Sequence, residues 1–313
     1  MDGLLVIDKP AGPTSHDVVA RVRRILRERS VGHTGTLDPA ATGVLPLVVG
    51  RATRLARFLS VSDKAYDAVI RFGFATDTGD ASGVVIGDGD RQGDPGLPTR
   101  AQIEGALDHF RGTFLQQPPA FSAKKIGGTR SYAIARRQRA NCNVPDTLQV
   151  GGVGPSPVSV CVHRLEIVDL HGDLLTLTME CSAGFYVRSL AHDLGVRLGI
   201  GAHLTSLRRT RSGDVTLDDA IPLAAAEADP ARAAAFLVPP ARMLAGLPSI
   251  VLTENGVRRA AHGHDIGPGD VAAGGPTFDE GQVFVRLLSP SGDLVAMAQT
   301  TASGALHPSV VLV

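Results

Sequence analysis

The segment Gly32-His33-Thr34-Gly35-Thr36-Leu37-Asp38-Pro39 lies between two apolar stretches and places a histidine and a carboxylate in one glycine-rich loop. Glycines allow a backbone to approach a ligand closely. Local physics also favours a plainer structure, a turn in which Asp38 caps a helix that Pro39 opens. The segment by itself therefore leaves two interpretations open, a ligand-binding or catalytic loop and a helix cap.

Several familiar kinds of site do not fit this loop. A phosphate-binding P-loop requires Gly-Lys-Ser or Gly-Lys-Thr, and neither follows. A retaining glycosidase needs a second positioned carboxylate, and nothing in the sequence pairs Asp17 or Asp63 with Asp38. The chain has three cysteines with no Cys-x-x-Cys spacing, which predicts neither a disulfide framework nor a zinc site and favours a reducing compartment. The cysteines are Cys142, Cys161 and Cys181.

Hydrophobic periodicity around the loop predicts a mixture of strands and helices. A helix capped by Ser15 carries valines on one face, and alternation with period two indicates a strand at Lys64–Phe74. We read Asp77–Pro98, rich in Gly and Asp, as a surface excursion. Further strands are expected at Gly3–Asp8, Leu45–Val49, Val158–Leu170, Leu174–Cys181 and Leu204–Arg211, and further helices after the cap Thr99, near Ser131–Arg139 and over Tyr186–Leu198.

Composition places the chain among ordinary globular proteins. Of its 313 residues 43% are hydrophobic and 20% are charged, with a formal net charge of zero. No apolar run is long enough to span a membrane, and we expect no secretory signal. Basic residues cluster locally, and a fold could gather them on one nucleic-acid-binding face or leave them as solvated helix faces. The clusters are Arg21–Arg29, Arg51–Arg57, Lys124–Arg139 and Arg208–Arg211.

Five ordered segments carry a resemblance to a known family. The string GHTGTLDPAATGVLPL (32–47) resembles the signature of the TruB family of pseudouridine synthases. The other four segments match the same family in the same order. They are LLVIDKPAGPTSHDVV (4–19), KAYDAVIRFG (64–73), QQPPAFSAKKIGGTRSY (116–132), and CSAGFYVRSLAHDLGVRLG (181–199) with its sequel AHLTSLRRTRSG (202–213). The resemblance covers about residues 1–225, and the segment Ala140–Pro157 departs from the family pattern.

The resemblance implies an α+β fold. It has a central, mainly antiparallel sheet flanked by helices in a catalytic domain over residues 1–225. A shift in composition to Ala, Pro and Leu near Pro222–Pro240 indicates a linker, placed at 226–245. Residues 246–313 then form a small β-rich unit that resembles a PUA domain. We expect in it a helix after Thr253 and strands at Gln282–Leu288, Leu294–Gln299 and Val310–Val313.

The family's residues carry over by position. Asp38 matches the catalytic aspartate, Tyr66 the tyrosine that stacks on the target uracil and can take its C5 proton, and Arg188 the arginine that pairs with the aspartate. The resemblance implies substrate binding by His33, Lys9, Tyr186 and Leu207. Our hypothesis is that Arg188 keeps Asp38 anionic inside a closed pocket, where desolvation raises a carboxyl pKa.

The residues also have plainer interpretations. Tyr66 and Leu207 are typical of core positions on strands, and Arg208 and Arg209 are typical of surface or RNA-backbone contacts. His33 alone favours neither loop hydrogen bonding nor function.

The implied activity is isomerisation of uridine to pseudouridine at position 55 in the T-loop of tRNA, by base flipping and religation through C5. The expected partner is the tRNA T-arm, with no cofactor, metal, membrane or guide RNA, and the expected state is a cytoplasmic monomer. Two alternatives stay open. One is a subunit of an RNA-guided synthase, and the other is a non-catalytic RNA-binding or RNA-folding protein. We expect Asp77–Pro98 and Lys124–Asn143 to be mobile segments that contact RNA.

Overall fold

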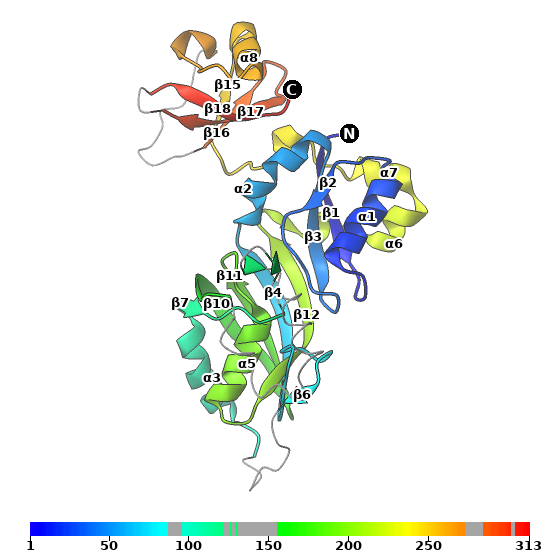
Figure 1. Ribbon diagram of the computed structural model, residues 1–313, viewed down its shortest axis with the longest axis vertical. Coiled ribbons are helices and arrows are strands. Elements are labelled where there is room, and N and C mark those ends of the chain that lie inside the picture. The colour runs from blue at the N-terminus through cyan, green and yellow to red at the C-terminus, as the bar shows by residue number, and fades with distance from the viewer. Residues whose placement is uncertain (87–95, 122–124, 127–128, 131–154, 273–283, 302–303) are drawn as a thin grey trace.

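The protein is described by a computed structural model that covers residues 1–86, 96–121, 125–126, 129–130, 155–272, 284–301 and 304–313. It is an elongated molecule with a large sheet in the body and a small sheet at one end, and both chain termini lie toward that end (Figure 1). The large sheet is flanked by helices and the small sheet stands apart from it. The predicted α+β class is therefore confirmed.

The large sheet is mainly antiparallel, as predicted. Its strands follow the order β14-β1-β3-β12-β4-β11-β10-β7, while β2 pairs with β3 and β13 with β12. Only two of its pairings among the described residues, β1 with β14 and β3 with β12, are parallel. The strands are β1 (Gly3–Lys9), β2 (Val31–His33), β3 (Thr42–Val49), β4 (Lys64–Phe72), β7 (Gly112–Gln116), β10 (Val158–His171), β11 (Leu174–Cys181), β12 (Ala202–Ser212), β13 (Val215–Thr216) and β14 (Ile221–Pro222).

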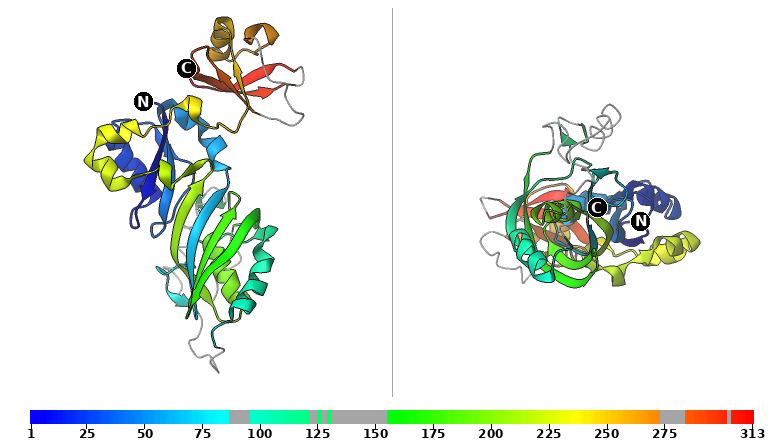
Figure 2. Two further views of the ribbon diagram at one scale, coloured as in Figure 1. Left: turned by 180° about the vertical axis from the view of Figure 1, so that it is seen from behind. Right: turned by 90° about the horizontal axis from the view of Figure 1, so that it is seen from below.

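Helices cover one face of this sheet. In the view from behind in Figure 2, the strands of the lower half face the viewer and the helices lie beyond them. The α1 helix begins one residue earlier than expected, because Thr14 rather than Ser15 is its cap and forms a capping box with Asp17. The helices are α1 (Ser15–Ile25), α3 (Arg100–Leu107), α5 (Val187–Arg197), α6 (Leu223–Ala228) and α7 (Pro230–Ala235), with the short α2 (Ala56–Ser60) elsewhere.

Two apolar clusters sandwich the strands β1 and β3. Alternate residues of a strand point to opposite faces, so Leu5 and Ile7 join the core beneath the helices, while Leu4 and Val6 join a second cluster on the other face. The second cluster includes Leu294, Met297 and Leu312 from the C-terminal unit. The small sheet is thus attached to the large one by buried apolar side chains.

The C-terminal unit has the predicted helix and three strands, although β18 (Leu306–Val311) begins four residues before the predicted Val310–Val313. Thr253 caps α8 (Glu254–Ala261) as expected. Its sheet has the order β15-β16-β17-β18, with β15 (Ser249–Val251) added to the predicted strands. The other strands are β16 (Val285–Leu288), β17 (Leu294–Thr300) and β18 (Leu306–Val311).

The segment predicted as a linker is partly helical. Both α6 and α7 place residues in the core of the large sheet, among them Leu223, Ala226 and Ala233, which are all at most 2% exposed. The first part of the segment 226–245 therefore belongs structurally with residues 1–225. The division into the three predicted ranges stays a prediction.

The predicted surface excursion at Asp77–Pro98 begins as an ordered hairpin whose residues Ala81, Ser82, Val84 and Val85 are exposed. The strands β5 (Ala75–Thr76) and β6 (Val85–Ile86) form a hairpin, and its turn is pinned to β12 by backbone hydrogen bonds to Leu204. Residues 87–95 lie outside the described residues, as does nearly all of Lys124–Asn143 apart from the strands β8 (Lys125–Ile126) and β9 (Thr129–Arg130). The helix expected near Ser131–Arg139 lies outside them too.

Candidate active site

Asp38 lies in the loop between β2 and β3 of the large sheet. The loop makes a tight turn in which the Ala41 amide donates to the Asp38 carbonyl at 3.1 Å. No helix follows Pro39, because the chain enters β3 at Thr42. The helix-cap interpretation of Asp38 is therefore wrong, and its carboxylate, 38% exposed, is left to other partners.

Buried side chains hold this loop by its backbone. The Lys9 ammonium donates to the carbonyls of Pro39 and Ala41 at 3.1 and 2.7 Å, and Ser15 bonds both the amide and the carbonyl of Leu37. Backbone groups away from water need such partners, since an unpaired one costs about as much as a lost hydrogen bond. These contacts fix the Asp38 loop without secondary structure.

Arg209 supports the same loop from β12. Its guanidinium donates to the carbonyls of Val44 and Gly35 at 2.7 and 3.1 Å, and the residue is 1% exposed. The interpretation of Arg209 as a surface residue is wrong. Gly43 allows this packing, because it has φ +98° and a Cβ there would lie 2.2 Å from the Arg209 carbonyl oxygen.

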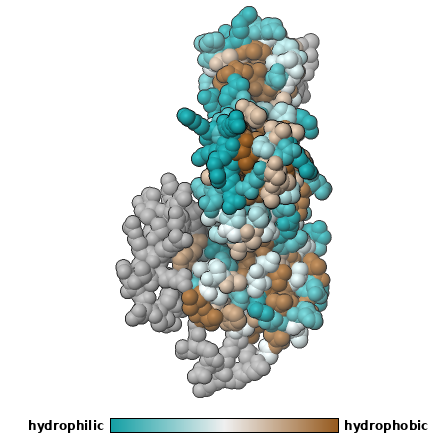
Figure 3. Space-filling model, turned by 90° about the vertical axis from the view of Figure 1, so that its right-hand side faces the viewer, coloured by the Kyte–Doolittle hydropathy of each residue, from teal (hydrophilic) through white to brown (hydrophobic). Residues whose placement is uncertain are grey.

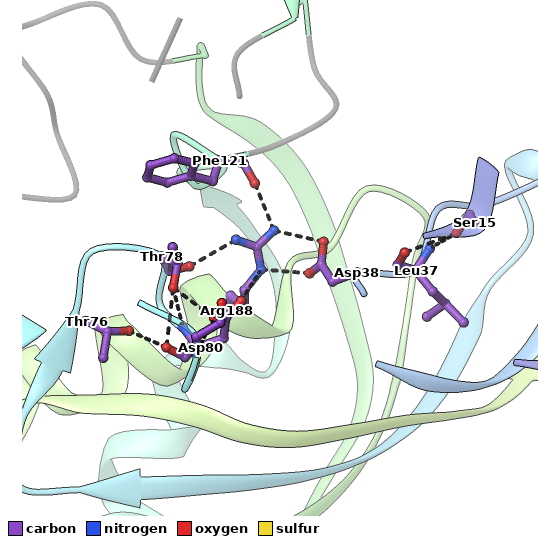
Figure 4. Close-up of polar contacts among 9 residues, drawn as sticks. Ser15, Leu37, Asp38, Thr76, Thr78, Asp80, Phe121 and Arg188 are labelled. Atoms are coloured by element: carbon purple, nitrogen blue, oxygen red, sulfur yellow. Dashed lines mark hydrogen bonds and ion pairs between the residues drawn. The ribbon is translucent and has the colours of Figure 1, made fainter. Parts of the chain in front are cut away.

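Arg188 pairs with Asp38 as the resemblance predicts. The Nε and Nη2 atoms of Arg188 lie 2.8 and 3.2 Å from the two oxygens of Asp38, which makes a forked, charge-assisted contact (Figure 4). The guanidinium also donates to the carbonyls of Thr78 and Phe121 at 3.0 and 2.9 Å. A cation gains nothing from the dipole in the first turn of a helix, so these partners explain why a buried arginine occupies that turn of α5.

Asp80 is a second carboxylate at this pair that the sequence did not single out. Its Oδ2 atom lies 3.9 Å from Arg188 Nε, and its Oδ1 atom accepts hydrogen bonds from the Thr78 hydroxyl and the Ser82 amide (Figure 4). The bonds hold the carboxylate beside the guanidinium. A Thr-x-Asp-x-Ser turn after a short strand is the only local signal that marks the residue.

A cavity of about 240 Å³ opens beside the pair. Asp38 and Arg188 line it together with Tyr66, Tyr186 and Leu207, so five of the seven predicted site residues come together. Burial raises the pKa of the Tyr66 phenol above its ordinary value.

Tyr186 is held in the cavity wall by a residue that sequence reasoning missed. The Gln116 side chain exchanges two hydrogen bonds with the Tyr186 backbone, at 2.8 and 3.0 Å. Gln116 is 1% exposed and lies at the end of β7. A buried amide that matches both a backbone donor and a backbone acceptor fixes the start of α5, and with it the positions of Tyr186 and Arg188.

Two predicted substrate-binding residues do not line this cavity. Lys9 is fully buried, and its ammonium donates three hydrogen bonds to the backbone carbonyls of Pro10, Pro39 and Ala41. Burial lowers the Lys9 pKa to about 8, while nearby Asp38 opposes that shift. His33 ends β2 with its ring 5.1 Å from that of His16. Lys9 thus supports the loop from behind, and substrate binding by His33 stays a prediction.

Several of the basic clusters are already partly paired. Arg21 lies 3.3 Å from Glu227, Arg51 lies 2.8 Å from Asp2, and Arg54 donates to the Val311 carbonyl of the C-terminal unit. Figure 3 faces the side on which Figure 1 places α1 and α6, and hydrophilic residues gather at their height.

In the described part of the chain no group of three or more His, Cys, Asp or Glu side chains could hold a metal ion, and no helix there has the length and apolar character of a membrane span.

Comparison with known families agrees with this geometry. Residues 23–187 match the model of the TruB family pseudouridylate synthase N-terminal domain, and residues 188–234 match that of the tRNA pseudouridylate synthase B C-terminal domain. The first match alone spans more than half of the chain. The chain belongs to the TruB family. The boundary between the two matches falls inside the site, with Asp38 and Tyr66 in the first and Arg188 and Leu207 in the second.

Relatives within the TruB family resemble the whole chain. The tRNA pseudouridine synthase B of Solibacter usitatus is 43% identical over 320 residues and that of Gloeobacter violaceus 42% over 316, and each alignment covers at least 99% of both proteins. Among solved structures, a Cbf5-Nop10-Gar1 complex contains a chain that is 26% identical, with a TM-score of 0.70 over 99% of this chain and 85% of that one. An H/ACA RNP bound to substrate RNA gives the same TM-score at 24% identity, a likeness in fold.

Proposed function

We propose that this chain isomerises uridine to pseudouridine at position 55 in the T-loop of tRNA. The observation that carries the proposal is the Asp38–Arg188 pair at the wall of a cavity that also presents two tyrosines. Relatives that align along the whole chain bear the name tRNA pseudouridine synthase B. That name supports tRNA as the substrate.

The geometry suits a base that leaves its helix. Extruding a nucleotide costs a few kcal/mol, and stacking a base on an aromatic side chain returns about 1–3 kcal/mol. Tyr66 and Tyr186 provide such surfaces in the cavity, and Leu207 adds an apolar wall. The flipped uracil would lie between them, with its ribose toward Asp38.

Asp38 is the group that acts on the sugar. Arg188 offsets the desolvation free energy of the ionised Asp38 carboxylate when the pocket closes over a base. Its forked contact also orients both carboxylate oxygens. The carboxylate breaks the bond between N1 and C1′ either by attacking C1′ or by removing a sugar proton. The base turns and C5 bonds to C1′. Tyr66 would act as a relay for the C5 proton, accepting it at the phenol oxygen while its own hydroxyl proton passes on, and N1 gains a proton. The product has the same atoms as the substrate, so no co-substrate is consumed.

The proposed partner is the T-arm of an unmodified tRNA, bound by a monomer in the cytoplasm without a guide RNA. Tritium release from C5-labelled uridine in a tRNA transcript, with no other RNA present, tests this directly. Wild type should release the label, while Asp38→Asn should bind the same tRNA and release none. If wild type releases no label until a guide RNA is added, the guide-dependent alternative is favoured.

The third possibility is an RNA-folding role without catalysis. The same Asp38→Asn variant addresses it, because that variant keeps the cavity and its tyrosines. Remodelling of misfolded tRNA by Asp38→Asn would establish RNA folding as a separate activity. Label release by wild type alone would establish the catalytic one.

A further inference from the structure

Two buried cations flank Tyr66 on the inner wall of the cavity. Lys64 lies two residues before Tyr66 on β4 and so shares its face. Arg209 is directly opposite Tyr66 across the β4–β12 pairing. Both cations line the cavity, yet Lys64 is 6% exposed and Arg209 is 1% exposed. They therefore form its deep end, while the half-exposed Asp38 lies toward the mouth.

Neither cation has a carboxylate partner within 4.0 Å among the described residues. Lys64 donates to the carbonyls of Ser60 and Ser62, and Arg209 to those of Val44 and Gly35 and to the Tyr66 phenol oxygen. An ammonium has three N–H donors and a guanidinium has five. Each side chain therefore has at least one N–H donor that these acceptors do not use. The neighbouring Asp63 opposes the lowering of the Lys64 pKa by burial, but its carboxylate lies beyond 4.0 Å from the ammonium and contacts the His163 ring at 3.1 Å.

Burying a cation without a counter-charge is costly. An anion that enters the cavity would recover part of that cost, because Coulomb attraction is strong where water is excluded. RNA phosphates stay on the strand that runs over the protein surface, whereas Lys64 and Arg209 are almost fully buried. The inner wall beside Tyr66 is instead within reach of the flipped base itself.

We propose that Lys64, together with Arg209, stabilises the detached uracil as its anion. This inference rests on the proposed function. When the N1–C1′ bond breaks, its electron pair stays with the ring and spreads over N1, O2 and O4. The ring turns while it carries this charge. C5 then bonds to C1′ and loses its proton, and N1 gains a proton. The ring is therefore an anion only after the N1–C1′ bond breaks and before the C5–C1′ bond forms.

Lys64 is the better residue to test, because Arg209 also holds the Asp38 loop. Burial lowers the Lys64 pKa to about 8, so at pH 7 the ammonium is still mostly protonated. Lys64→Met removes the charged terminal atom and keeps an unbranched side chain of the remaining length. Lys64→Gln is a second neutral variant, whose amide can still donate to the carbonyls of Ser60 and Ser62. Lys64→Arg restores the charge.

The assay is single-turnover conversion of two tRNA transcripts at pH 7, one with uridine and one with 5-fluorouridine at the target position. Loss of the N-linked nucleoside is followed by digestion and mass spectrometry. Fluorine makes the detached ring a more stable anion that needs less help from the protein. We expect both neutral variants to slow uridine conversion by on the order of 100-fold, with a loss several-fold smaller on 5-fluorouridine. Lys64→Arg should restore most of the rate.

Arg71→Met is the matched control, since Arg71 lies on the same strand, pairs with Asp173 and does not line the cavity. It should convert both substrates at the wild-type rate. An equal loss on the two substrates in the Lys64 variants would overturn the proposal in favour of a structural role. A higher Kd for tRNA in these variants, with a Kd that depends less steeply on salt than that of wild type, would show instead that Lys64 contacts a phosphate. If wild type converts neither substrate, it is the proposed function that fails.

Discussion

Replacing Arg188 by methionine tests whether the arginine is needed to hold Asp38 ready for chemistry. The change removes two charge-assisted hydrogen bonds to Asp38, at 2.8 and 3.2 Å, each of a kind that contributes about 1.5–3 kcal/mol. Asp38 is 38% exposed, so solvent compensates in part and about 3–4 kcal/mol is the reasonable expectation. At 1.36 kcal/mol per factor of ten, the rate should fall by roughly two to three orders of magnitude.

The assay is single-turnover tritium release with enzyme in excess over tRNA, so that product release does not limit the rate. Binding measured in parallel should change little, because Arg188 is 6% exposed and faces the carboxylate. Arg188→Lys keeps the charge without the planar fork and should recover part of the loss. The reasoning is refuted if Arg188→Met folds, binds tRNA and stays within tenfold of the wild-type rate.

Four further changes have defined outcomes. Asp80→Asn should slow single-turnover conversion less than Asp38→Asn does, since Asp80 lies 3.9 Å from Arg188; an unchanged rate would contradict its part in the pair. Gly43→Ala should lower the free energy of unfolding by at least about 1–3 kcal/mol in denaturant titrations, because φ is +98° and the Cβ meets Arg209. Burial raises the pKa of Asp193 to about 6, so the native state holds an extra proton between pH 4 and 6 and stability falls as pH rises through that window. Asp193→Asn should therefore stabilise the protein at pH 7 but not below pH 4. Burial lowers the pKa of Lys64 to about 8, so the unfolded state binds more protons between pH 8 and 10.5; wild type should gain stability relative to Lys64→Met over that range.

Regular elements could be predicted from the sequence because their signals are local. The alternation over Lys64–Phe74 reflects a strand with one face on the core, and β4 indeed spans Lys64–Phe72. Thr99 and Thr253 cap their helices as expected, because a capping side chain bonds an amide only two or three residues away. The helices α6 and α7 are not predicted, because alanine-rich segments with few large side chains resemble a connection. Their buried residues Leu223, Ala226 and Ala233 pack into the core of the large sheet, which no local pattern indicates.

The site could be predicted only by resemblance. Asp38 and Arg188 are 150 residues apart, and no periodicity or spacing relates them. Gln116 meets Tyr186 across 70 residues, and Asp80 reaches the pair only because its turn is bonded to β12. Such contacts follow from the order of strands in the sheet, which local patterns do not determine.

The buried cations explain how a chain with zero net charge can favour an anionic reaction. A loop without secondary structure needs donors for its carbonyls, and Lys9 from β1 and Arg209 from β12 supply them. Both donors are cations, so the side chains that hold the Asp38 loop also place positive charge beside it. Substitutions of Lys9 or Arg209 will therefore change stability and rate together. Lys64 bonds only the Ser60 and Ser62 carbonyls outside that loop, which makes it the cation whose effect on rate can be separated from the fold.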